Sequence, residues 1–303
     1  MTRFLPLLVL LAALASVVAS LRPLRNHGPF DLVAFGQLPV VVNGRVKPLD
    51  TVARTSLLVL QGRQRVSDPA ASTPFVHSPA EWLADVLFHP AKADTYPTFR
   101  ISASDSPDLL TLMGLTEEHT KVQHQSAIMR ALAVADFVPS TRSRFSYQQL
   151  EPRLGELDRQ AKLADAVEPQ LRNGFQKAVV QLRDRLVLYQ RLKHSLVPPA
   201  SDDFLGELAR FQDNLAAGVA AVRAKQAGEA HDEKIAETTV ALANHFVTMA
   251  QTGYLLAVPP AAGEHHENEW KNAGTVLLET FESGRVSPFV LTYAGLARTW
   301  RSN

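Results

Sequence analysis

The chain has 303 residues, of which 46% are hydrophobic and 20% are charged, and this composition is typical of a folded globular protein. Its 31 basic and 30 acidic side chains leave a formal net charge of +1, which argues against a nucleic-acid-binding protein because those usually carry a basic excess. No cysteine is present, so disulfides, zinc–thiolate sites, iron–sulfur clusters and covalently attached c-type haem on this chain are all excluded.

An uncharged apolar run, Leu5 to Leu21, dominates the first residues and has arginines on both sides. As a helix it is about 25 Å long, which is at the low edge of what a bilayer core requires. We interpret residues 1–23 as either a signal peptide, with a small-residue cleavage site at Val18-Ala19-Ser20, or an uncleaved membrane anchor. A buried helix of a soluble protein is the third interpretation.

A compact strand, turn and helix pattern follows between Leu38 and Leu60. Asn43-Gly44 favours a tight turn between two short strands because both residues tolerate positive φ, and Pro48 suits the first position of a helix. The helix is expected to expose Asp50, Arg54 and Gln61. Its predicted buried face recurs at helical spacing and consists of Leu49, Val52, Ala53, Ser56, Leu57 and Leu60.

The middle of the chain predicts several shorter elements. Ser78-Pro79-Ala80-Glu81 is typical of a helix start with a cap, a proline and an early carboxylate. The segments that follow predict a strand at 95–101, a short helix to residue 112 and a helix over 116–135. Next come a helix capped by Ser146, interrupted near Gly155 or Pro169, and a long amphipathic helix over 171–196.

Pro198 to Asp202 is the best internal boundary, because prolines there end the long helix. We therefore predict a helical extracytoplasmic domain with a short strand-turn unit over 24–200 and a C-terminal helical bundle segment over 201–303. Helices are expected to begin near 204, 232, 264 and 288. The predicted fold is mainly α: a hydrophobic anchor, a small mixed unit, then a bundle of long helices.

Catalytic motifs are absent: no GxSxG, Walker A or GxGxxG pattern occurs, so we expect no enzyme. Arg45, Lys47 and Arg54 lie near a helix N-terminus and are either an anion site or solvated charges. His265 and His266, flanked by two glutamates, are either a surface turn or a metal site that supports hydrolysis. His245, beside Phe246 on an apolar helix, is either a core histidine or an axial ligand of haem.

The segment NGRVKPLDTVAR (Asn43 to Arg54) resembles the N-terminal extracytoplasmic region that precedes the CcsA-type membrane domain in some bacterial System II cytochrome c biogenesis proteins. Further similarity lies in WLADVLF (82–88), RFSY (144–147) and LVLYQRL (186–192). The tryptophan-rich WWD motif and the membrane-flanking histidines of that family's haem-handling domain are not in this chain.

The resemblance implies a non-catalytic accessory or scaffold domain of cytochrome c maturation that assists haem delivery to apocytochrome c. It implies a location at the bacterial inner membrane with the bulk of the chain in the periplasm. The implied partners are a membrane-embedded CcsA-type haem-handling protein and apocytochrome c, with haem bound transiently and not covalently. The alternative is an extracytoplasmic helical ligand-binding or sensor module that uses Arg45, Lys47 and Arg54 as its anion site.

Overall fold

The computed structural model describes residues 10–11, 13–14, 30–68, 75–101, 107–115, 143–260 and 269–302. This part of the chain is mainly helical and carries three two-stranded antiparallel sheets, so the mainly α prediction is confirmed. The predicted helix over 116–135 and almost all of the predicted anchor over 1–23 lie outside the described residues. Among the helices that are described, none has the length and apolarity to cross a bilayer, so the anchor is not shown.

The predicted hairpin and helix form the first compact unit. After α2 (Leu32–Gln37), β1 (Pro39–Val42) pairs with β2 (Arg45–Pro48) through Asn43 and Gly44, whose φ angles are 54° and 70°. The turn prediction is therefore confirmed. All six residues of the predicted buried face are buried in α3 (Leu49–Gln61). Gln61 was predicted to face solvent, and this is wrong: it is 1% exposed because its side chain holds the loop that follows.

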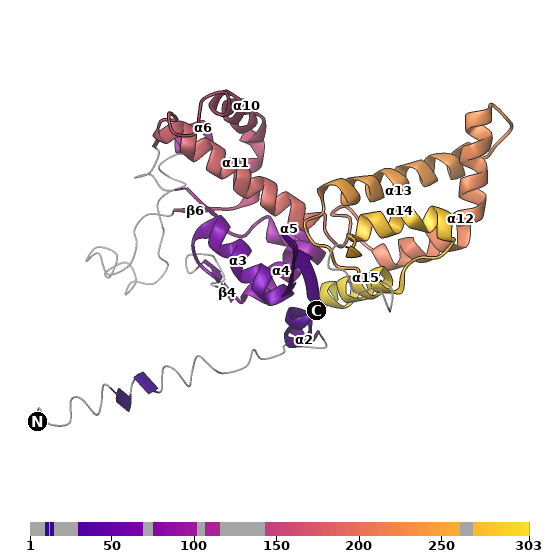
Figure 1. Cartoon of the computed structure of the whole chain (residues 1–303), viewed down its shortest axis with the longest axis horizontal. Helices are drawn as coiled ribbons and strands as arrows, with labels where there is room; N and C mark the ends of the chain where they lie inside the picture. Colours follow the sequence, from indigo (N-terminus) through magenta and orange to yellow (C-terminus); the bar gives the residue numbers. More distant parts are fainter. Residues whose placement is uncertain are drawn as a thin grey trace, which may run out of the picture.

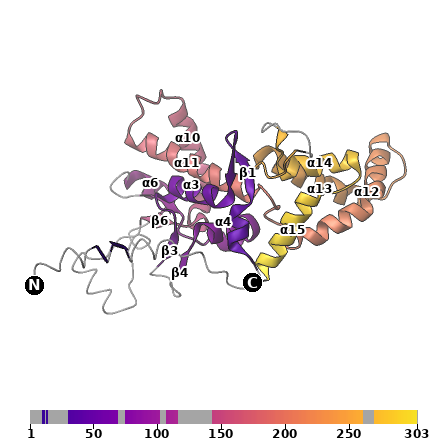
Figure 2. The ribbon, with the colours of Figure 1, turned by 60° about the horizontal axis from the view of Figure 1, so that its bottom comes forward.

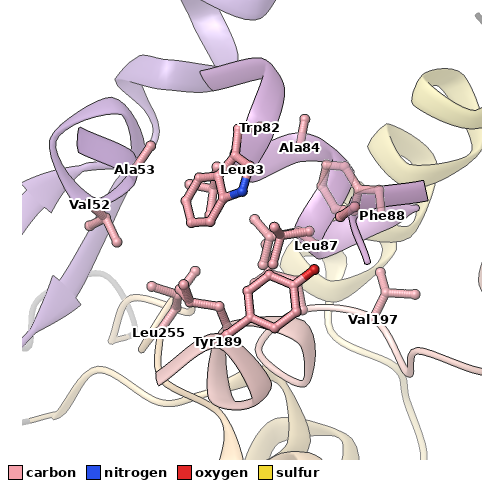
Figure 3. Packing of buried hydrophobic residues seen from close by; sticks show 14 of the residues in the cluster. Val52, Ala53, Trp82, Leu83, Ala84, Leu87, Phe88, Tyr189, Val197 and Leu255 are labelled. Carbon is pink, nitrogen blue, oxygen red and sulfur yellow. The ribbon is translucent and has the colours of Figure 1, made fainter. Parts of the chain in front are cut away.

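Helix α4 (Pro79–Phe88) is the centre of the hydrophobic core. It follows β3 (Val66–Asp68) and β4 (Phe75–His77), and Ser78 and Glu81 form the predicted capping box at its start. Figure 3 shows its Trp82, Leu83 and Leu87 among residues that come from α3, from α11 and from the segment near Leu255. Because every side of α4 is covered, it carries an apolar residue at almost every position.

The middle segment departs from the prediction in its boundaries. The strand predicted at 95–101 is only β5 (Phe99–Arg100), which pairs with β6 (Arg144–Phe145). Ser146 caps the next helix as expected, and the chain then continues through α9 (Tyr147–Leu150), η2 (Glu151–Arg153) and α10 (Leu154–Asp165). Gly155 lies within α10, so the interruption falls near Pro169. The long helix α11 (Gly174–Lys193) begins after a capping box at Asn173, and Leu171 is 73% exposed outside it.

The C-terminal part is a bundle of α12 (Phe204–Ala227), α13 (Glu233–Thr252), α14 (Ala273–Ser283) and α15 (Pro288–Arg301) (Figure 1). Asp203, Asp232 and Asn272 cap the first three helices with their side chains. The helix predicted from 264 starts only at Ala273, because Lys271 pairs with Val258 in an isolated bridge and Asn272 then caps the helix.

The end of the chain packs on the N-terminal part. The indole Nε1 of Trp300 donates to Oδ1 of Asp85 at 2.9 Å, and Arg301 donates to the carbonyl oxygen of Phe88. Val41 of β1 pairs with Leu256 in an isolated bridge. Figure 2 shows α15 running toward α4. These contacts join residues on both sides of position 200, and the predicted domain boundary stays a prediction.

Candidate functional site

A groove of about 530 Å³ lies between α12 and α13. The two helices run antiparallel, with Phe211 packed against Phe246 and Lys225 paired with Glu233 at the other end of the hairpin. A volume of this size is in the range of sites that hold small molecules and cofactors. Because α13 forms one wall along most of its length, the groove follows the helix axis.

The floor of the groove is apolar. Phe211, Leu215, Ile235 and Leu242 line it. On its buried side, Phe211 makes edge contacts with the rings of Phe246 and Phe281, whose centroids are 5.4 Å and 5.2 Å from its own. Aromatic edge contacts fix ring orientation, so the floor has a defined shape. An apolar ligand that enters the groove would bury its surface against these side chains.

The charged side chains at the edge of the groove form no ion pairs with other described residues. Arg210, Lys234 and Glu207 line the groove but form no ion pair within the described residues, and His245 forms no hydrogen bond there. The hydroxyls of Thr238 and Thr239 instead donate to carbonyl oxygens of α13 itself, at 2.8 Å each. The polar groups still available to a ligand therefore include the two cations, the imidazole, the carboxylate of Glu207 and the side-chain carbonyl oxygen of Asn214.

His245 is the predicted site residue that the structure places in the groove. It is exposed on α13, so its interpretation as a core histidine is wrong. Its neighbour Phe246 is fully buried, and successive side chains point about 100° apart on a helix, which carries His245 out of the core. Because Phe211 packs on Phe246, the adjacent Arg210 lies at about the same level of the groove as His245.

The structure places the other predicted residues elsewhere. Arg45 and Lys47 lie on β2, and Arg54 lies on α3, and none of the three lines the groove. The Nε of Arg54 donates to Oδ2 of Asp50 at 2.6 Å, which partly neutralises it. Arg45 is exposed on the hairpin. An anion site at these three residues stays a prediction, and it is separate from the groove.

The predicted metal site at His265 and His266 lies outside the described residues. Within the described ranges, no group of three histidine or acidic side chains could hold a metal ion.

Sequence reasoning missed two carboxylates that organise polar networks, the buried Asp85 and the half-buried Asp94. Asp85 is 1% exposed and accepts the hydroxyl of Tyr96 at 2.6 Å in addition to the Trp300 indole. Asp94 accepts the Lys193 ammonium at 2.8 Å and the Tyr189 hydroxyl at 2.9 Å. Burial and the adjacent carboxylate raise the pKa of both tyrosines, so each phenol stays protonated as a donor. Asp85 also accepts the ammonium of the exposed Lys92 at 3.3 Å. These networks join α15 to α4 through Trp300 and Asp85, and α11 to the segment at Asp94.

Arg210 and Lys234 of the groove were also missed. The available signal is the width of the apolar stripe on α13, where Ile235, Leu242, Phe246 and Met249 recur at helical spacing. The stripe alone does not reveal which of its residues a neighbouring helix covers. Their exposure depends on how α12 and α14 pack against α13.

Comparison of the chain with protein-family models, with curated proteins and with solved structures finds no match in any of the three. The fold and the groove together describe a mainly helical protein with an apolar, cation-rimmed cleft between two antiparallel helices.

Proposed function

We propose that this chain is a non-catalytic accessory domain of cytochrome c maturation and that the α12/α13 groove is its haem-handling site. The observation that carries the proposal is the exposed His245 beside an apolar hollow of about 530 Å³. An imidazole next to an apolar cavity is the arrangement that proteins commonly use to hold haem iron.

The residues of the groove fit the group. His245 would supply a nitrogen ligand to the iron, and Phe211, Leu215 and Leu242 would contact the apolar faces of the macrocycle. Arg210 and Lys234 are cations without an ion pair in the described structure, so they are available to the propionates. The groove is open to solvent along the helices, which favours reversible binding and release over permanent retention.

The N-terminal unit supports the same proposal through its sequence. The resemblance rests on Asn43 to Arg54, which form the β1–β2 turn, β2 and the first half of α3. In the proposal the chain is held at the periplasmic face of the bacterial inner membrane by its N-terminal apolar run. It assists a membrane-embedded CcsA-type partner that transfers haem to apocytochrome c.

The test is a haem titration of the full chain in a neutral detergent, followed by the Soret band. The wild type should give a saturable shift. His245→Ala should weaken binding at least tenfold, because His245 supplies the one imidazole among the described residues that line the groove. The matched control is His231→Ala, because His231 lies in the loop between α12 and α13, outside the groove, and its imidazole contacts Glu233.

Equal shifts in the wild type and in His245→Ala would contradict the haem site. If neither the wild type nor any variant shifts the Soret band, the chain does not bind haem. A scaffolding role would then have to be shown by direct binding of the chain to the CcsA-type partner.

A further inference from the structure

The side chain of Gln212 joins α12 to the turn between α14 and α15. Its Nε2 donates to the carbonyl oxygen of Gly284 at 2.7 Å, and its Oε1 accepts the backbone N–H of Val286 at 2.7 Å. An amide side chain carries both a donor and an acceptor, and this pairing uses both. Because Gln212 is held at two points, the rotation of α12 about its own axis is fixed at this residue.

The turn that receives Gln212 is itself well defined. Gly284 ends α14 in the left-handed conformation, with a φ of 74°, and its backbone N–H donates to the carbonyl oxygen of Thr280 at 2.9 Å. Glycine takes this conformation without the steric cost that a β-carbon brings. Val286 follows and is buried. The turn therefore offers Gln212 a donor and an acceptor at fixed positions.

The other end of α14 is tied to α13, the second wall of the groove. Nδ2 of Asn272 donates to the carbonyl oxygen of Ala250 at 2.8 Å. A β-carbon on Gly274 would lie 2.2 Å from the backbone nitrogen of Ala250, so the two helix backbones approach closely there. Figure 1 shows α14 alongside α13. Helix α14 is therefore connected to α13 near its start and to α12 just after its end.

Fixing Gln212 also fixes the direction of the α12 residues that line the groove. Successive side chains on a helix point about 100° apart, so Arg210, two positions earlier, points about 160° away from Gln212. Arg210 and Phe211 both line the groove. The ring of Phe211 contacts Phe246 of α13 and Phe281 of α14, with ring centroids 5.4 Å and 5.2 Å away. One ring from each of the three helices therefore meets beneath the groove.

We infer that Gln212 is a positioning residue for the haem site proposed above, and this inference rests on that proposal. Gln212 does not itself line the groove. Its two hydrogen bonds hold α12 so that Arg210 stays available to a haem propionate and Phe211 keeps its place in the floor. A change at Gln212 should therefore alter the affinity for haem without removing any group that contacts it.

The experiment is a haem titration of the full chain in a neutral detergent, with Gln212→Leu compared with the wild type. Leucine makes neither hydrogen bond, so the affinity should fall about tenfold, while the number of haem molecules bound per chain stays the same. A loss of folded protein would instead lower the number bound and leave the affinity unchanged. Gln212→Met, which is unbranched like glutamine, should give the same loss of affinity and serves if leucine disturbs the fold.

The matched control is Gln176→Leu. Oε1 of Gln176 accepts the backbone N–H of Asn173 at 3.0 Å in the capping box of α11, so the same substitution removes a hydrogen bond outside the groove. Its affinity for haem should equal that of the wild type. Equal losses of affinity in Gln176→Leu and Gln212→Leu, or wild-type affinity in both Gln212 variants, would overturn the inference.

Amide hydrogen exchange without haem gives a readout that does not depend on the proposed function. Exchange in residues 207–215 of α12 should be faster in Gln212→Leu than in the wild type, and unchanged in Gln176→Leu. If the wild type binds no haem, the proposed haem site fails, and faster exchange confined to this segment would still support Gln212 as the residue that holds this wall. Unchanged exchange in Gln212→Leu overturns the positioning role whether or not haem binds.

Discussion

Helices α4 and α13 are both rich in apolar residues, but the protein covers them very differently. Nine of the ten residues of α4 are buried, whereas only Ala236, Phe246 and Met249 are buried among the 20 residues of α13. Neighbours surround α4 on all sides, while α12 and α14 cover only part of α13. The comparison shows that the apolar residues of α4 all pack in the core, whereas part of the apolar face of α13 stays accessible in the groove, where we propose that a ligand binds.

The largest expected effect is a truncation in α4. Trp82→Ala should lower the free energy of unfolding by about 3–5 kcal/mol, because it leaves a cavity at a fully buried site. Urea denaturation measures this change. Trp82→Phe is the control: Nε1 of Trp82 has no partner in the described structure, so its removal relieves an unsatisfied donor and should cost far less. Equal losses in both variants would show that the indole nitrogen matters more than the packing.

A smaller effect is expected where α12 and α13 touch. A β-carbon on Gly218 would lie 2.4 Å from Oγ1 of Thr239, so Gly218→Ala should force the helices apart and cost about 1–3 kcal/mol. Adding Thr239→Ala should restore most of the loss, since it removes the clashing atom. Urea denaturation of the two single variants and the double variant measures the coupling. Additive effects would mean that the helices do not meet there.

A bulky side chain in the groove should change the free energy of unfolding least, but it should prevent the proposed haem binding. Ala241 lines the groove and is exposed, so Ala241→Phe should shift the free energy of unfolding by less than about 0.5 kcal/mol. The same change should remove the Soret shift, because the new ring occupies the hollow. Retained haem binding in a folded Ala241→Phe variant would place the haem elsewhere.

The pH dependence of stability should distinguish two histidines. Burial lowers the pKa of His77 below its ordinary 6.5. The stabilisation from its neutral imidazole is therefore fully present above pH 6.5 and is lost as the pH falls through the lower folded pKa. The carbonyl oxygen of Glu229, and then Glu233, raise the pKa of His231, so its stabilisation is fully present below 6.5 and is lost as the pH rises through the higher folded pKa. His77→Gln should therefore reduce the loss of melting temperature from pH 6.5 to pH 5, and His231→Gln should reduce the loss from pH 6.5 to pH 8. An unchanged pH dependence in both variants would contradict these environments.

Local chemistry explains what the sequence could predict. The Asn43-Gly44 turn, the caps at Ser78 and Ser146, and the buried face of α3 all follow from residues within a few positions of one another. The features that the sequence did not predict depend on contacts between residues that are far apart in the chain. Arg100 and Arg144 become neighbours only through strand pairing, and the exposure of His245 depends on which sides of α13 its neighbours leave open. Periodicity identifies an apolar face, but it does not reveal whether another helix covers that face.

Amide hydrogen exchange of the full chain, with and without haem, tests the central claim most directly. Haem should slow exchange in residues 207–215 of α12 and 234–245 of α13, the two segments that line the groove, and should leave α3 and α4 unchanged. The His245→Ala variant should lose this protection. Protection confined to α3 and α4, or protection in α13 that survives His245→Ala, would contradict the assignment of the groove as the haem-handling site.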